Sequence, residues 1–265
     1  MEAHEIDYEI IGDDIQCVEI ELDPNETVIA EPGAMMLMET GIVMNTIFGD
    51  GSKNESGLMN KLFSAGKRVL TGENLFMTAF TQTGMNKAKV TFAAPYPGKI
   101  IPMNLSKLGG KLICQKDAFL CAAKGVSVGI AFQKRLGVGF FGGEGFIMQK
   151  LEGDGMAFVH AGGNIVKKTL IAGEVLTVDT GCLVAISQTV DYNVELQKGI
   201  KNSLFGGEGL FLVKLKGPGD VWIQSMPLSR LADRIVKYAP KSGGKRKGEG
   251  SVLGGIGDLL GGDRY

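Results

Sequence analysis

Three glutamates in a shared sequence context are the residues whose type and spacing could do chemistry. Glu144 lies within Phe140–Met148, and Glu208 lies within the similar run Leu204–Leu212 further along the chain. Glu73 occupies a weaker copy of this context before Glu144. If all three faced one axis, their carboxylates could bind a cation or a basic partner. The ordinary alternative is that each caps a turn or pairs with a basic residue that precedes it, and these are Lys67 and Arg68, Lys134 and Arg135, and Lys198 and Lys201.

Histidine and glycine motifs contribute little further chemistry. The chain has two histidines, His4 and His160, too few for a clustered metal triad, and His160 is expected to be a hydrogen-bonded strand residue. Gly137–Gly142 matches the G-x-G-x-x-G pattern, but a strand rather than a helix is expected to follow it, so the amides of a helix N-terminus would be missing. We therefore expect a non-enzymatic protein without a cofactor. An enzyme with an unrecognised carboxylate site is an alternative.

A hydrophobic and basic segment between Phe48 and Arg68 is the best candidate for a partner or membrane-surface contact. Its apolar residues fit a short helix, and basic residues are interleaved with them. The contact residues would be Leu58, Met59, Leu62, Phe63, Lys67 and Arg68. The alternative is that this segment covers its own β-sandwich.

The elements that position these residues recur along the chain, at the spacing that separates Glu144 from Glu208. Leu112–Cys114 matches Leu176–Val178 at this spacing, and Val28–Ala30 is an earlier copy. The interval from Gly33 to Glu73 is longer than the two later intervals, Asp117 to Glu144 and Gly181 to Glu208, which are equal. The first copy therefore carries an insertion, and the chain is expected to contain three repeats of about 64 residues.

The repeats are expected to be built of strands. Short apolar runs such as Ala118–Ala122 and Val175–Val178 are bounded by Gly, Asp, Asn or Pro, and Gly84–Asn86 and Asp154–Gly155 are typical of hairpin turns. The predicted fold class is all-β, with three tandem antiparallel β-sandwich repeats related by pseudo-threefold symmetry. The expected ranges are repeats at about 5–105, 106–170 and 171–226, in one domain over 1–240, with an amphipathic helix at about 227–238 that packs on the β body and a flexible Gly-rich tail over 241–265.

Composition limits the function classes. The net charge is −1, which does not favour a nucleic-acid partner, because such proteins need a basic face. The 40 glycines suit turns and bulges between strands. The four cysteines form no C-x-x-C pair and are expected to be reduced core thiols. The N-terminus resembles neither a secretory signal nor a transit peptide, so a cytoplasmic location is the expectation.

Several of these motifs resemble one known family. Glu31–Met36, the pair Phe140–Gly145 and Leu204–Gly209, and the Leu-x-Gly-x-Gly turns that follow are similar to the AIM24 family, also called DUF124. The resemblance covers roughly residues 5–238. It implies β units like those of the tryptophan RNA-binding attenuation protein, no agreed catalytic residues, and, for the mitochondrial branch, a role in inner-membrane organisation.

The function expected from the residues and the resemblance together is a scaffold or partner-binding protein. It would be a homo-oligomer or bind a protein partner, with peripheral membrane contact as one version, because fused β units with exposed edges often associate. The first alternative is a small-ligand or nucleic-acid-binding module that uses a cleft between repeats.

Overall fold

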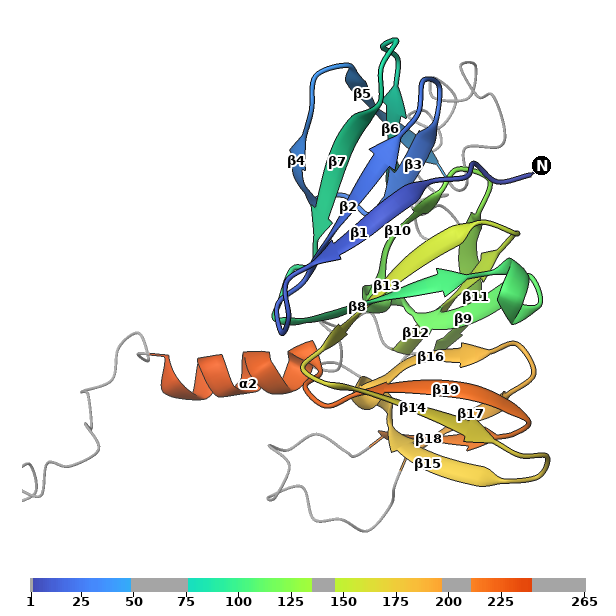
Figure 1. Cartoon of the computed structure of the whole chain (residues 1–265). Helices are drawn as coiled ribbons and strands as arrows, with labels where there is room; N and C mark the ends of the chain where they lie inside the picture. The colour runs from blue at the N-terminus through green and yellow to red at the C-terminus, as the bar shows by residue number, and fades with distance from the viewer. Residues whose placement is uncertain (1, 49–75, 135–145, 197–210, 240–265) are drawn as a thin grey trace, which may run out of the picture. The chain divides into compact units, whose positions relative to one another are not determined.

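A computed structural model of the chain describes residues 2–48, 76–134, 146–196 and 211–239 (Figure 1). The chain is mostly β, and every strand pairing in these ranges is antiparallel. It divides into two compact units, Met1–Ser229 and Arg230–Tyr265. The all-β prediction is confirmed, together with its single C-terminal helix.

The strands of the first part of the chain are β1 (Asp7–Ile11), β2 (Cys17–Leu22), β3 (Thr27–Ala30), β4 (Met35–Met38), β5 (Ile42–Phe48), β6 (Phe76–Gln82) and β7 (Ala88–Ala93). Those of the middle are β8 (Gly98–Asn104), β9 (Lys111–Gln115), β10 (Phe119–Ala123), β11 (Ser127–Lys134), β12 (Phe146–Glu152) and β13 (Met156–Gly162). The last are β14 (Ile165–Leu170), β15 (Val175–Asp179), β16 (Leu183–Ser187), β17 (Asp191–Leu196), β18 (Phe211–Lys216) and β19 (Gly219–Gln224). The 3-10 turns η2 (Ser106–Leu108), η3 (Lys116–Ala118) and η5 (Thr180–Cys182) interrupt them.

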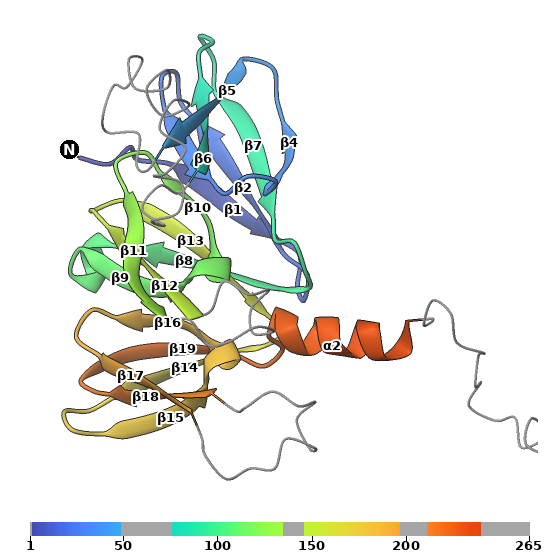
Figure 2. The ribbon, with the colours of Figure 1, turned by 180° about the vertical axis from the view of Figure 1, so that it is seen from behind.

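The strands form four sheets, which can be followed from two sides in Figures 1 and 2. Their strand orders are β1-β2-β7-β4, β5-β6-β3-β10-β13-β8, β11-β12-β9-β16-β19-β14 and β15-β18-β17. In the second and third sheets, three strands from one part of the chain join three from the next part, through β3–β10 and β9–β16. The described pairings form no third junction of this kind, so the pseudo-threefold arrangement is not confirmed.

Burial patterns follow from these positions. In β2, buried and half-buried residues alternate, because successive side chains of a strand point to opposite faces. The joining strands β3 and β10 are buried at every residue, because both faces are covered. The buried apolar residues of the described ranges form three clusters, and the largest brings together Ile29, Leu112 and Trp222, which are far apart in the chain.

The two predicted hairpin turns do not join paired strands, and that prediction is wrong. Gly84–Asn86 connects β6 to β7, and Asp154–Gly155 connects β12 to β13. In both cases the second strand belongs to a different sheet from the first. Turn residues favour a local reversal, but they do not specify whether the chain returns beside the same strand or enters another sheet.

The C-terminal helix α2 (Leu228–Tyr238) begins after Pro227, as predicted. Its apolar residues Leu228, Leu231, Ala232, Ile235 and Val236 recur at helical spacing, and none of its residues is buried. Packing of this helix on the β body stays a prediction. The predicted tail over 241–265 lies outside the described residues.

Candidate functional site

The site residues predicted from the sequence lie outside the described residues. This holds for the three glutamates Glu73, Glu144 and Glu208. It holds equally for the contact segment, with Leu58, Met59, Leu62, Phe63, Lys67 and Arg68. Both hypotheses stay predictions, and the candidate sites below come from other residues.

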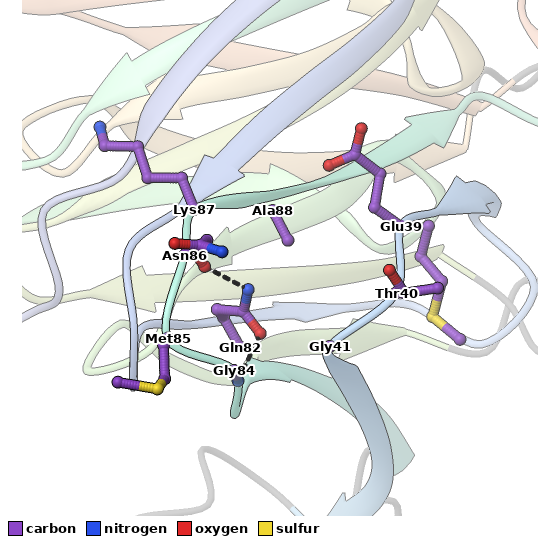
Figure 3. Close-up of a pocket in the computed structure, with 10 residues that line it drawn as sticks. Glu39, Thr40, Gly41, Gln82, Gly84, Met85, Asn86, Lys87 and Ala88 are labelled. Atoms are coloured by element: carbon purple, nitrogen blue, oxygen red, sulfur yellow. Dashed lines mark hydrogen bonds between the residues drawn. The ribbon is translucent and has the colours of Figure 1, made fainter.

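A surface pocket of about 520 Å³ lies where β4, β6 and β7 end or begin (Figure 3). Its lining is Met38, Glu39, Thr40, Gly41, Gln82, Gly84, Met85, Asn86, Lys87 and Ala88. Gln82 organises the floor, because its side-chain amide donates to the carbonyl of Asn86 and its Oε1 accepts from the Gly84 amide at 2.8 Å. The pocket is therefore shaped by a buried glutamine that holds the turn between β6 and β7.

The charged groups at this pocket already have protein partners. The Lys87 ammonium lies 2.9 Å from Glu21 and 3.4 Å from Asp23, and hydrogen bonds to these two carboxylates raise the pKa of Lys87. The Glu39 carboxylate accepts from the Lys89 amide at 2.8 Å. These contacts leave the pocket suited to a small polar ligand held by amide groups rather than to acid–base chemistry.

Glu31 is the carboxyl group with the most perturbed titration among the described residues. It follows β3, and its amide donates to the carbonyl of Leu120 at 3.1 Å, so it stands at the β3–β10 junction. Burial, followed by the nearby charge of Asp117, raises the pKa of Glu31 to about 7, and Lys116 opposes the shift. The surface pocket is lined by neither acid.

His160 in β13 is buried without a hydrogen bond of normal geometry at either ring nitrogen. Its ring packs edge-on against Tyr96, with 4.4 Å between ring centroids. A side chain at Gly98 would place its Cβ 2.8 Å from His160 Nε2, so glycine makes this packing possible. Burial lowers the pKa of His160 to about 4, and the nearby backbone of Tyr96 opposes part of that shift. His160 is a buried strand residue, and its position in a strand agrees with the expectation.

The unpaired edge of β4 is the feature that sequence reasoning missed. In the part of the chain that the structure describes, β4 pairs with β7 alone. Met36, Leu37 and Met38 are 56%, 43% and 40% exposed, although they are consecutive apolar residues in a strand. A run of consecutive apolar residues is typical of a buried strand, so the sequence alone does not indicate that this strand is exposed. An apolar strand with open backbone donors and acceptors is a template for another strand.

Comparison with known proteins places this arrangement in a family. A model of the family described as "Mitochondrial biogenesis AIM24" matches residues 8–226, which include every described strand except the first residue of β1. The chain belongs to the AIM24 family. The resemblance noted in the sequence is thereby confirmed.

Two streptococcal proteins are similar to this AIM24-family chain. An uncharacterised protein of Streptococcus pyogenes serotype M6, M6_Spy0233, is 31% identical over 228 residues, which are 85% of this chain and 87% of that protein. The crystal structure of protein SPYM3_0169 from Streptococcus pyogenes matches with a TM-score of 0.69 and 25% identity, covering 89% of this chain and all of that one. Both matches support the fold, and neither title states an activity.

The described part of this AIM24-family chain yields three further observations on sites. All four cysteines are free thiols, but the expectation that all lie in the core is wrong for Cys17, which is half-exposed. No group of three His, Cys, Asp or Glu side chains in the described ranges could hold a metal ion. A bilayer-spanning helix is also lacking among those residues.

Proposed function

We propose that this AIM24-family chain is a non-enzymatic scaffold in which three copies of one β unit bind protein partners through sheet edges. The units, predicted at about 5–105, 106–170 and 171–226, correspond in this proposal to β2–β7, β8–β13 and β14–β19, so β8 and β14 each begin a unit rather than end the one before. The strand orders support this, because β5-β6-β3, β11-β12-β9 and β17-β18-β15 follow the same pattern, as do β4-β7-β2, β10-β13-β8 and β16-β19-β14.

The pairing registers also support the repeat between the second and third units. Leu112 lies opposite Leu151 in β9–β12, and Leu176 lies opposite Leu215 in β15–β18. Both partners are shifted along the chain by the same amount, which is the spacing that separates Glu144 from Glu208. A register shared over two strands is a stronger sign of a repeat than sequence similarity alone, since a one-residue slip would turn every side chain to the other face.

The observation that carries the proposal is the exposed edge of β4. Its three exposed apolar side chains stand beside backbone groups that face no other described strand. An added strand would satisfy those groups and bury Met36 and Met38, which is the physical basis of β-strand addition. Methionine suits such a surface because its side chain is flexible and polarizable.

Site-specific photo-crosslinking tests the proposal. A photoreactive phenylalanine analogue placed at Met38 in cells should give discrete cross-linked products. The matched control is Met85, which is 94% exposed but lies in the loop between β6 and β7, off any sheet edge. If position 38 gives no discrete product beyond those of position 85, the proposal is wrong.

A peripheral membrane contact is a second candidate, favoured by helix α2. Its apolar stripe is accompanied by Arg230, Arg234 and Lys237, and basic amphipathic helices bind anionic lipid surfaces. Sedimentation with vesicles that contain anionic lipid should pellet the wild-type chain and not the Ile235→Asp/Val236→Asp variant. Equal pelleting of both would exclude this helix as the contact.

Two further candidate functions have narrower support. The pocket beside Gln82 supports a small-ligand module, and the raised pKa of Glu31 supports a carboxylate enzyme. Neither places a cluster of reactive groups around a cavity, so the edge of β4 is the better-supported site.

A further inference from the structure

The two junctions within the chain show how one β unit joins the next. In the first, Cys121 of β10 lies opposite Ala30 of β3. In the second, Ala185 of β16 lies opposite Cys114 of β9. Both junctions are antiparallel and cover three residue pairs. The chain therefore uses one kind of edge contact twice.

Strand β4 has the position in its sheet that β10 and β16 have in theirs. Each of the three strands pairs with the last strand of its unit, and each pairing has a register shift after its first residue, at Met35, Phe119 and Leu183. When residues are counted from this shared bulge, Met38 in β4 corresponds to Ala122 in β10 and to Ile186 in β16. Bulges are specific features of a strand, so their recurrence fixes the alignment.

The backbone of β4 is oriented for the same contact. The amide of Glu39 donates to Lys89 in β7, so by strand alternation the amide and carbonyl of Met38 face the open edge. At the β3–β10 junction, the amide of Lys124 donates to Thr27, which places Ala122, two residues earlier, on the side that faces β3. Corresponding residues of β4 and β10 thus point their backbone groups in the same direction.

Strand β15 is the counterpart of β3 and β9. It is one of the two edge strands of the three-stranded sheet and pairs with β18 alone among the described strands. Its register places Thr177 at the position of Ile113, which lies opposite Ile186 at the β9–β16 junction. One half of the joining contact is therefore open at β4 and the other half at β15.

The side chains of β4 and β15 are exposed because each of these strands has no described neighbour on its open edge. Strands β3 and β10 are buried throughout and β16 nearly so, whereas three of the four residues of β4 are exposed. In β15, Val175 is 58% exposed and Thr177 is also exposed, although β9 is buried at four of its five residues. Apolar residues stand at the open edges as they do at the closed junctions.

We propose that β4 of one copy of this chain pairs antiparallel with β15 of a second copy, in the register of the internal junctions. Met38 then lies opposite Thr177, and Leu37 opposite Val178. This inference rests on the proposed scaffold function and names its partner as another copy of the chain. The contact is head to tail, so it generates rings or filaments rather than an isologous dimer.

Disulfide trapping tests the register directly. In a Cys17→Ser background, which removes the half-exposed native thiol, Met38→Cys and Thr177→Cys are made as separate variants, and both sites are exposed in a single chain. Mixed and oxidised with copper phenanthroline, they should give a dimer that contains one copy of each variant, because directly opposed strand residues are close enough for a disulfide. Each variant alone should give little dimer.

The matched control shifts one cysteine by a single residue. Leu37→Cys replaces Met38→Cys, and Leu37 is equally exposed. A one-residue slip turns the side chain to the other face, so the mixture with Thr177→Cys should give roughly tenfold less dimer. Circular dichroism of each variant confirms that the fold is retained.

Four results would overturn the inference. Equal dimer yield from both mixtures would show that the proposed register is wrong. A chain carrying both Met38→Cys and Thr177→Cys that closes on itself at high dilution, without cross-linked dimers, would show that the two edges meet within one copy. No dimer from the mixture, with position 38 still photo-crosslinking to a different protein, would reject self-pairing and leave the proposed scaffold function intact. Absence of both products would reject the two together.

Discussion

His160 shows how one buried residue couples this fold to pH. Burial favours the neutral form of this ring, and the folded-state pKa of about 4 lies below the ordinary value of 6.5. Between these two values the unfolded chain binds a proton that the folded chain does not. The stability that this group contributes is therefore complete above about pH 6.5 and is lost as the pH falls towards 4.

The His160→Leu variant should lack this acid-side loss. Its free energy of unfolding, measured by urea denaturation from pH 7 to pH 4, should rise relative to wild type as the pH falls, by up to about 3 kcal/mol at pH 4. The difference between the two proteins is the informative quantity, because Glu31 acts in the opposite direction. Its raised pKa lowers stability as the pH rises from about 4.5 to about 7.

A His160→Gln variant controls for packing, since it keeps a polar side chain but cannot titrate. It should show the same pH-dependent difference as His160→Leu, whatever its stability at pH 7. A constant difference from wild type across this pH range in both variants would mean that His160 titrates alike in the folded and unfolded chains.

At the scale of the strand, β4 and β10 form a natural comparison. Both are short apolar strands with a register shift after their first residue, β4 in its pairing with β7 and β10 in its pairing with β13. Strand β10 has β3 on its other side and is buried, whereas β4 has an open edge. Similar sequences thus contribute differently to the stability of one chain.

Lysine substitutions at Ala122 and Met38 should reveal this difference in stability. Ala122→Lys places a charge in a fully buried strand and should cost about 3–5 kcal/mol of unfolding free energy. Met38→Lys places it at an exposed edge and should change the stability of the dilute chain by about 0.5 kcal/mol or less. Chemical denaturation at low protein concentration measures both. Similar costs for the two would show that β4 is as enclosed as β10.

At the scale of the whole molecule, the sheets cross the boundaries of the sequence units. The second sheet combines strands from before residue 83 with strands after residue 97, and the third combines β9 with β16. The largest apolar cluster likewise spans Ile29 to Trp222. The two six-stranded sheets each join strands from neighbouring parts of the chain, so the β body should fold as one cooperative structure.

Differential scanning calorimetry should therefore show one unfolding transition for the β body, with equal calorimetric and van't Hoff enthalpies. Ala122→Lys should move the transition to lower temperature without splitting it, because the loss of the β3–β10 junction exposes both neighbouring units. Two resolved transitions in the wild-type chain would mean that the units unfold independently.

Much of the local structure was predictable from the sequence. Apolar runs bounded by turn residues specified strands such as β10 and β15, and the spacing of apolar residues after Pro227 specified α2. The candidate site was harder to predict, since the exposed run Met36–Met38 has the same composition as a core strand. The pKa shifts of Glu31 and His160 could not be predicted from the sequence either, because a pKa shift depends on burial and on neighbours that are distant in the chain.

The sequence by itself determined the strand-rich fold class, the recurrent spacing of its motifs and the C-terminal helix. The tertiary structure alone decided which strands pair, that Gly84–Asn86 and Asp154–Gly155 lead into different sheets, and that β4 and β15 keep open edges. The reason is physical. Side-chain patterns specify which face of a strand is buried, but backbone donors and acceptors are alike in every residue, so the identity of the neighbouring strand emerges only when the whole chain is packed.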